Sequence, residues 1–201
     1  MSKIVDHDAR RRDFIKAAFE TIIENGLANT TVRAVAHKAG YTTGALVHYF
    51  NDKDELIRRA LDYSGEIVRG RMIAARRQQR GREALRDVLR EALPLDERRS
   101  ANWRVWLALW YHSEDNTDMR REEKRRYREW TNRLQQILRE SVEDGELSSS
   151  VDLQLEADAL VAFVDGLGVR SLMFSRRMSS KHLTNLLDRY LDRFYGDTLN
   201  A

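Results

Sequence analysis

The chain has 201 residues, of which 42% are apolar and 33% charged, the balance of a soluble globular protein long enough to bury a sizeable core. It contains no cysteine, which excludes disulfides, thiolate metal sites and cysteine nucleophiles and fits a reducing cytoplasm. The formal net charge of +3 is too small to indicate a nucleic-acid partner by itself, so such an argument must rest on where individual residues lie.

Export and membrane insertion find no support in the sequence. The longest uninterrupted apolar run is Val105–Tyr111, far short of the roughly 20 residues that a membrane-spanning helix needs. The N-terminus, MSKIVDHDARRRDF, carries charges where a secretion signal would have an apolar stretch. We therefore expect a cytoplasmic protein with no membrane partner.

The first 50 residues show helical periodicity, and no segment of the chain shows the strict alternation of a half-buried strand. We predict an all-α fold. Its first three helices are expected over residues 9–25, 31–38 and 43–50. Gly26 and Gly40 follow the first two helices as C-terminal stops, and Thr42 can cap the exposed amides of the third.

A long fourth helix is predicted next. Asp52 is a natural N-cap, and Glu55 three residues later completes an arrangement like a capping box. The apolar stripe continues to about residue 78, so the helix should be roughly 40 Å long and should connect two halves of the chain. Five more helices are expected, over residues 82–92, 102–112, 118–144, 153–175 and 180–195.

The second and third helices, joined by a tight turn, form a predicted helix-turn-helix, in which the later helix lies in the major groove of DNA. On a helical wheel, Leu46 and Phe50 face inward, and the outward side chains are short, as close entry into a groove about 12 Å wide requires. The alternative is that these residues only cap and pack a small bundle. The predicted DNA-binding residues are Thr31, Arg33, Thr42, Thr43, Gly44, Ala45, His48, Tyr49 and Lys53.

The stretch TTVRAVAHKAG, followed by YTTGALVHYFNDKDEL, closely resembles the DNA-binding signature of the TetR family of transcriptional regulators. Its most specific part is the pattern G-x-x-x-G-x-x-x-x-Y-F-x-x-K from Gly40 to Lys53. The resemblance implies an all-helical homodimer that binds an operator and is usually released from it by a small molecule. Tyr41, Ala45 and Val47 depart from the residues most frequent in the family, which bears on the operator sequence.

The stretches EALPLDERRSANWRVWLALWYHS and VDGLGVRSLMFS resemble the C-terminal domain of the choline-responsive betaine-pathway repressors, the BetI branch of that family. This resemblance supports a shared domain type and leaves the ligand open. We expect a DNA-binding domain over residues 1–55 and a ligand-binding and dimerisation domain over residues 56–201.

The predicted sixth helix is rich in tryptophan and apolar on all sides, so it should be fully buried. Its indoles could wall a cavity for a cation or could simply be core residues. Asp165 lies in an otherwise apolar helix and needs a partner, which we expect to be Arg170 or Arg104 rather than a cationic ligand. The candidate ligand-binding residues are Trp103, Trp106, Trp110, Tyr127, Phe163 and Asp165.

The last two helices carry apolar faces that could form a dimer interface, or that a single core could use. The resemblance to a dimeric family favours the interface. The candidate residues are Leu160, Val164, Leu167, Ser171, Leu183, Leu187, Tyr190 and Phe194.

Signals for catalysis are weak. The five histidines have no metal-ligand spacing, and Gly166-x-Gly168 falls inside a helix rather than after a strand, so it is no dinucleotide fingerprint. We expect no enzyme, metal or cofactor. The leading hypothesis is a DNA-binding transcriptional regulator. The alternatives are a small-molecule-binding helical protein with a vestigial helix-turn-helix and an architectural DNA-binding protein without sequence preference.

Overall fold

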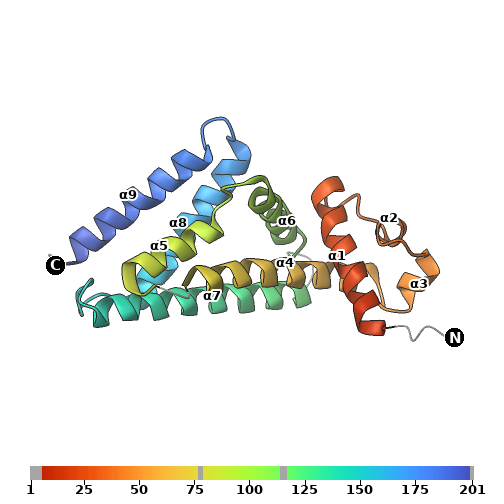
Figure 1. Ribbon diagram of the computed structural model, residues 1–201, viewed down its shortest axis with the longest axis horizontal. Helices are drawn as coiled ribbons and strands as arrows, with labels where there is room; N and C mark the ends of the chain where they lie inside the picture. Colours follow the sequence, from red (N-terminus) through yellow and green to blue (C-terminus); the bar gives the residue numbers. More distant parts are fainter. Residues whose placement is uncertain (1–5, 77–78, 114–116, 200–201) are drawn as a thin grey trace. The chain divides into compact units, whose positions relative to one another are not determined.

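The computed structural model describes residues 6–76, 79–113 and 117–199, and over these ranges it contains nine helices and no strand (Figure 1). The predicted all-α fold class is confirmed. The helices are α1 (His7–Asn25), α2 (Val32–Lys38), α3 (Thr43–Val47), α4 (Lys53–Arg76), α5 (Gly81–Ala92), α6 (Glu97–Ser113), α7 (Thr117–Glu143), α8 (Leu153–Met173) and α9 (Ser180–Leu199).

Three helix boundaries differ by three or more residues from the sequence-based expectation, and one of them is the end of α9, which lies at Leu199 instead of Tyr195. α3 ends at Val47, because His48 and Tyr49 form a turn. α6 begins at Glu97, because the Asp96 carboxylate accepts a backbone N–H of the first turn at 2.8 Å. The first turn of α6 is charged, so the apolar periodicity that predicted this helix begins later than the helix itself.

Contacts within the chain divide it into two compact units. The first comprises the chain up to Ile67 together with Arg104–Trp110, and the second comprises Val68–Trp103 and the chain from Tyr111 onward. α4 continues without a break from the first unit into the second, and its 24 residues span about 36 Å.

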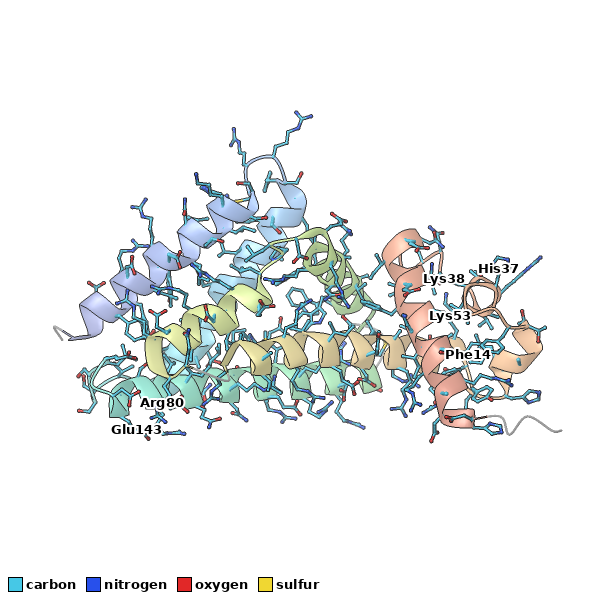
Figure 2. The ribbon with its side chains drawn as sticks, in the orientation of Figure 1. Phe14, His37, Lys38, Lys53, Arg80 and Glu143 are labelled. Atoms are coloured by element: carbon cyan, nitrogen blue, oxygen red, sulfur yellow. The ribbon has the colours of Figure 1, made fainter. Side chains whose placement is uncertain are left out.

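Phe14 is the centre of the core of the first unit (Figure 2). Its side chain is fully buried, and its ring centroid lies 5.0 Å from that of Tyr41, 5.5 Å from Tyr49 and 6.3 Å from Phe50. α1 thereby packs against the segment that contains α3. Other buried residues of this core are Ala18, Ile22, Val35, Ala36 and Leu46.

The predicted N-cap of α4 is confirmed. The Glu55 N–H donates to the Asp52 carboxylate at 2.6 Å, and the Glu55 carboxylate accepts the Asn51 N–H at 2.9 Å. Arg11 of α1 also donates to the Glu55 carboxylate, at 3.0 Å. The start of α4 is therefore fixed both to its own cap and to α1.

In the second unit, α7 packs against α5 and α8, and α5 packs against α9. Ion pairs reinforce the contact between α5 and α9, among them Arg90 with Asp188 at 2.9 Å. Near the C-terminal end of α7, Arg80 lies opposite Glu143 at 3.3 Å (Figure 2). The fully buried side chains of this core include Leu85, Leu89, Leu134, Leu138, Leu160 and Leu187.

The residues predicted to form a dimer interface belong instead to the core of one chain. All but Tyr190 are less than 9% exposed, and Tyr190 packs partly buried against the same core. Apolar periodicity cannot distinguish a contact within a chain from a contact between chains, which explains the error. The corrected residues are Leu160, Val164, Leu167, Ser171, Leu183, Leu187 and Phe194. Any partner surface on α8 must therefore lie on its opposite face.

The expectation that the tryptophan-rich helix is buried on all sides is wrong. Trp103 and Val105 are buried, but Arg104 is exposed and Trp106 and Trp110 are partly exposed.

Over the described ranges, the helices are too short or too polar to cross a membrane.

Candidate nucleic-acid interface

The turn between α2 and α3 depends on Gly40. Its φ is +76°, in the left-handed region that favours glycine. The Gly40 N–H donates to the His37 carbonyl at 3.0 Å, and the Tyr41 N–H donates to the Ala36 carbonyl at 2.9 Å. This is the hydrogen-bond pattern of a Schellman cap, and it ends α2 so that the chain turns directly into α3.

α3 presents a buried side and an open side. Thr42 caps its N-terminus by accepting the Ala45 N–H at 3.2 Å, and Leu46 and Phe50 are buried at 2% and 4% exposure. The open side is therefore built from short side chains on a fixed backbone. It is exposed at Thr43, Gly44 and His48 and partly exposed at Ala45.

Gly44 has no reason inside the described chain to be glycine. A Cβ at this position would meet only the Thr42 hydroxyl, at 3.9 Å, which is an ordinary contact, and its backbone is helical. Glycine costs about 1 kcal/mol against alanine in a helix. The missing side chain leaves this part of the α3 backbone open to close approach from outside the chain.

Hydroxyl and basic groups lie on α2 and at the starts of α3 and α4, the elements next to this open side in the chain. The Thr31 hydroxyl accepts the Ala34 N–H at 3.1 Å, and the Thr42 hydroxyl is used in the same way, so each hydroxyl proton remains available for a phosphate oxygen. Arg33 is exposed on α2, and Lys53 is partly exposed at the start of α4.

Tyr49 packs against the core through its ring and carries a hydroxyl that is a candidate for a phosphate contact. Its ring lies 5.5 Å from Phe14 and 5.6 Å from His7, and its side chain is half-buried. Truncation to alanine would therefore disturb the core as well as remove the hydroxyl. Only the hydroxyl is a candidate for a phosphate contact.

Val47 is a residue that the sequence-based list omitted. It is 56% exposed on α3. Its position on the helical wheel, flanking the outward face, was the signal that could have included it. An exposed valine beside Ala45 is suited to contact thymine methyl groups.

In the second unit, Tyr127 of α7 donates a hydrogen bond to Asp165 of α8 at 2.9 Å. The predicted pairing of Asp165 with Arg170 or Arg104 is therefore wrong, and the Arg170 guanidinium lies 5.8 Å from the Phe174 ring. Burial raises the pKa of Asp165 to about 6, partly opposed by the hydrogen bond from Tyr127. Burial also raises the pKa of Tyr127, which keeps its hydroxyl protonated as a donor.

Trp103 is held by packing within the second unit. Its indole N–H donates to the Ala92 carbonyl at 2.8 Å, and a Cβ at Gly168 would lie only 2.3 Å from its ring. The indole therefore fills the space that Gly168 leaves open and links α6 to α5 and α8. This geometry makes Trp103 a core residue.

The other candidate ligand residues are divided between the two units. Phe163, in the second unit with Asp165 and Tyr127, stacks on Tyr190 with ring centroids 4.2 Å apart. Trp106 and Trp110, whose centroids are 5.9 Å apart, belong to the first unit.

Two families match different parts of the chain. Residues 14–60 match the family described as bacterial regulatory proteins, tetR family, and residues 81–196 match the one described as BetI-type transcriptional repressor, C-terminal. Both resemblances inferred from the sequence are therefore confirmed.

Known proteins agree with this assignment along nearly the whole chain. The chain is 28% identical to the HTH-type transcriptional regulator PksA of Bacillus subtilis, covering 96% of this chain and 93% of that protein. It is 30% identical to the HTH-type transcriptional regulator BetI of Burkholderia mallei, covering 96% and 97%. These relatives are transcriptional regulators, not enzymes.

Solved structures share the fold. A transcriptional regulator from Rhodococcus sp. Rha1 superimposes with a TM-score of 0.81 at 25% identity, covering 94% of this chain and 96% of that one. A regulator from Saccharomonospora viridis, solved in complex with choline, has the same fold with a TM-score of 0.85 at 23% identity, covering 92% and 96%. The chain belongs to the TetR family of transcriptional regulators and carries a C-terminal domain of the BetI type.

Proposed function

We propose that the protein is a cytoplasmic, homodimeric repressor that binds a palindromic operator and is released from it by a small molecule. Residues 1–55 bind the DNA, and residues 56–201 bind the ligand and the second chain. The observation that carries the DNA part is the open side of α3, where short side chains are exposed on a helix whose other side is buried.

The docking mode follows from the size of the groove. α3 enters the major groove with Gly44 and Ala45 leading, and Thr43 and Val47 contact base edges. Phosphate contacts fix the register of the protein on the duplex. They come from Thr31, Arg33, Thr42, His48, Tyr49 and Lys53. In a dimer, the two copies of α3 must lie about 34 to 36 Å apart to reach successive major grooves.

Release requires a link between the ligand and α3, and α4 is the continuous element that supplies it. A ligand that favours another separation of the two α3 helices would weaken DNA binding through α4. A hundredfold release needs only about 2.7 kcal/mol of coupling.

The effector we propose is a small organic cation that pairs with Asp165. Among the described residues of the second unit, no arginine or lysine forms an ion pair with Asp165, and Tyr127 contributes a neutral donor. The choline complex of the Saccharomonospora viridis regulator, a protein of the same fold, makes choline the first compound to test. Tyr127 and Phe163 supply aromatic faces that attract such cations.

The DNA part is tested with an operator selected from random duplexes, using gel shifts at several salt concentrations. Lys53→Ala should weaken binding about tenfold and make the salt dependence shallower by about two charges per dimer, because one phosphate contact is lost in each half-site. Tyr49→Phe removes the hydroxyl but keeps the packing against Phe14. Arg59→Ala is the matched control, since Arg59 is exposed on the same helix as Lys53.

If Lys53→Ala and Tyr49→Phe both bind the operator with the affinity and salt dependence of the unchanged protein, this face does not bind DNA. Equal affinity of the protein for random and selected duplexes at physiological salt would instead indicate binding without sequence preference.

A further inference from the structure

One face of α1 is directed at the segment that contains α3. His7, Arg10 and Phe14 follow one another on this face at spacings of three and four residues. Phe14 is buried, with its ring 5.0 Å from that of Tyr41 and 5.5 Å from that of Tyr49 (Figure 2). The His7 ring lies 5.6 Å from that of Tyr49. Arg10 therefore stands between two residues that both contact this segment.

The Arg10 guanidinium is held by the two tyrosines. Its central carbon lies over the Tyr41 ring, 4.9 Å from the ring centre, which is the geometry of a cation–π contact. Hydrogen bonding to the Tyr41 hydroxyl raises the pKa of Arg10, and the nearby Tyr49 hydroxyl adds to this effect. The position of the guanidinium is thus fixed by neutral groups, which leave its charge in place.

Arg11, the next residue, shows a different use of the same side chain. It donates to the Glu55 carboxylate at 3.0 Å, so its charge is matched within the unit. Among the described residues, Arg10 forms no ion pair with an aspartate or glutamate, although its side chain is partly exposed. A guanidinium that is held in one position and keeps its charge is suited to bind an anion from outside the chain.

The hydrogen bonds around Arg10 leave protons available for such an anion. The Tyr41 hydroxyl donates to the Asp13 carboxylate at 3.3 Å, so it meets Arg10 as an acceptor. The Tyr49 hydroxyl also meets Arg10 as an acceptor and therefore keeps its own proton for another group. A guanidinium carries more N–H donors than these two hydroxyls accept, and its planar fork matches the oxygens of a phosphate.

We propose that Arg10 and the Tyr49 hydroxyl together bind one phosphate of the operator backbone in each half-site, and that Tyr41 is the positioning residue that presents Arg10. The inference rests on the proposed DNA contact of α3 and adds α1 to the surface that binds the duplex. A side chain that is already ordered loses less conformational freedom on binding, so the contact with Tyr41 strengthens the contact with DNA.

The operator affinity of Arg10→Ala tests the phosphate contact, and Arg12→Ala is the matched control. Both variants remove one positive charge from α1, but Arg12 is exposed on another face of the helix. We expect Arg10→Ala to bind the selected operator about tenfold more weakly and to make the salt dependence shallower by about two charges per dimer. Arg12→Ala should change both quantities far less.

A double-variant cycle tests the role of Tyr41. Tyr41→Leu removes the ring under Arg10 and should weaken operator binding about threefold, whereas adding it to Arg10→Ala should cause no further loss. Tyr41→Phe keeps the ring and should lose less affinity than Tyr41→Leu. Because Tyr41 also packs against Phe14, denaturation must show that each variant is folded under the binding conditions. Losses that add in the double variant would mean that Tyr41 does not act through Arg10.

The outcomes separate this inference from the proposed function. If Lys53→Ala weakens operator binding and folded Arg10→Ala binds like the unchanged protein, the Arg10 contact is contradicted and the role of α3 stands. A less stable Arg10→Ala variant with full operator affinity would likewise assign Arg10 to the fold alone. If neither Lys53→Ala nor Arg10→Ala changes the affinity or its salt dependence, the inference and the proposed DNA contact both fail.

Discussion

α3 and α8 each carry a glycine within a helix, where alanine would be favoured by about 1 kcal/mol. At Gly168 of α8, the space for a Cβ is taken by the Trp103 ring, 2.3 Å away. At Gly44 of α3, the space for a Cβ is open, with only the Thr42 hydroxyl at 3.9 Å. The first glycine is required by the packing of the fold, whereas the second leaves an exposed stretch of backbone that the proposed DNA contact would use.

The largest effect is expected from a substitution in the core of the first unit, against which the segment containing α3 packs. Phe14→Ala should lower the free energy of unfolding by about 3–5 kcal/mol, because a fully buried aromatic side chain is lost from the centre of the first unit. Chemical denaturation measures the effect, and operator binding should be lost with it. Phe174→Ala, at a side chain that is 50% exposed, should change stability far less. Equal effects of the two variants would contradict the assigned core.

Gly168→Ala tests the glycine that serves the fold. The added Cβ overlaps the Trp103 ring, which its hydrogen bond to Ala92 holds in place, so we expect a loss of about 1–3 kcal/mol. Gly65→Ala on α4 is the control, because no atom lies within 4 Å of its Cβ position. Denaturation of both variants should give changes of opposite sign. A stable Gly168→Ala variant would mean that Trp103 is free to move.

Asp165→Asn tests the carboxylate of the second unit. The folded chain holds the Asp165 proton up to a pH of about 6, whereas the unfolded chain releases it near 3.8, so between these values the folded chain binds more protons. The stability of the unchanged protein should therefore fall, relative to Asp165→Asn, by about 1–2 kcal/mol as the pH rises from 4 to 7. Denaturation across this range measures the difference, and parallel curves would contradict the raised pKa.

The protonation state of Asp165 should also control the affinity for the proposed cationic effector. A cation binds the ionised carboxylate, so choline affinity should fall up to tenfold for each pH unit below about 6, and Asp165→Asn should remove both the affinity and its pH dependence. Calorimetric titration at pH 5 and 7.5 measures both. Asp197→Asn, at an exposed position near the end of α9, is the control.

Local signals allowed much of the fold to be predicted from the sequence. Gly26 and Gly40 end helices at positive φ, and Thr42 and Asp52 cap helices with their side chains, as their sequence positions indicated. These features depend on residues close together in the chain, which is why the helix-turn-helix and the start of α4 could be predicted.

Features that depend on packing between distant segments could not be predicted in the same way. The partner of Asp165 is Tyr127, 38 residues away on another helix, and nothing near either residue indicates the pair. The apolar residues Leu160 and Leu187 fit a dimer interface and a protomer core equally well, and only the burial of their side chains in one chain distinguishes the two.

The most direct test of the central claim, that the open side of α3 enters DNA, is the operator affinity of Gly44→Ala compared with Gly70→Ala. Neither added Cβ meets an obstacle in the chain, so both variants should be as stable as the unchanged protein or more stable by up to about 1 kcal/mol. We expect Gly44→Ala to bind the selected operator at least about tenfold more weakly, a loss of about 1.4 kcal/mol, while Gly70→Ala binds normally. Full operator affinity of a stable Gly44→Ala variant would contradict the account.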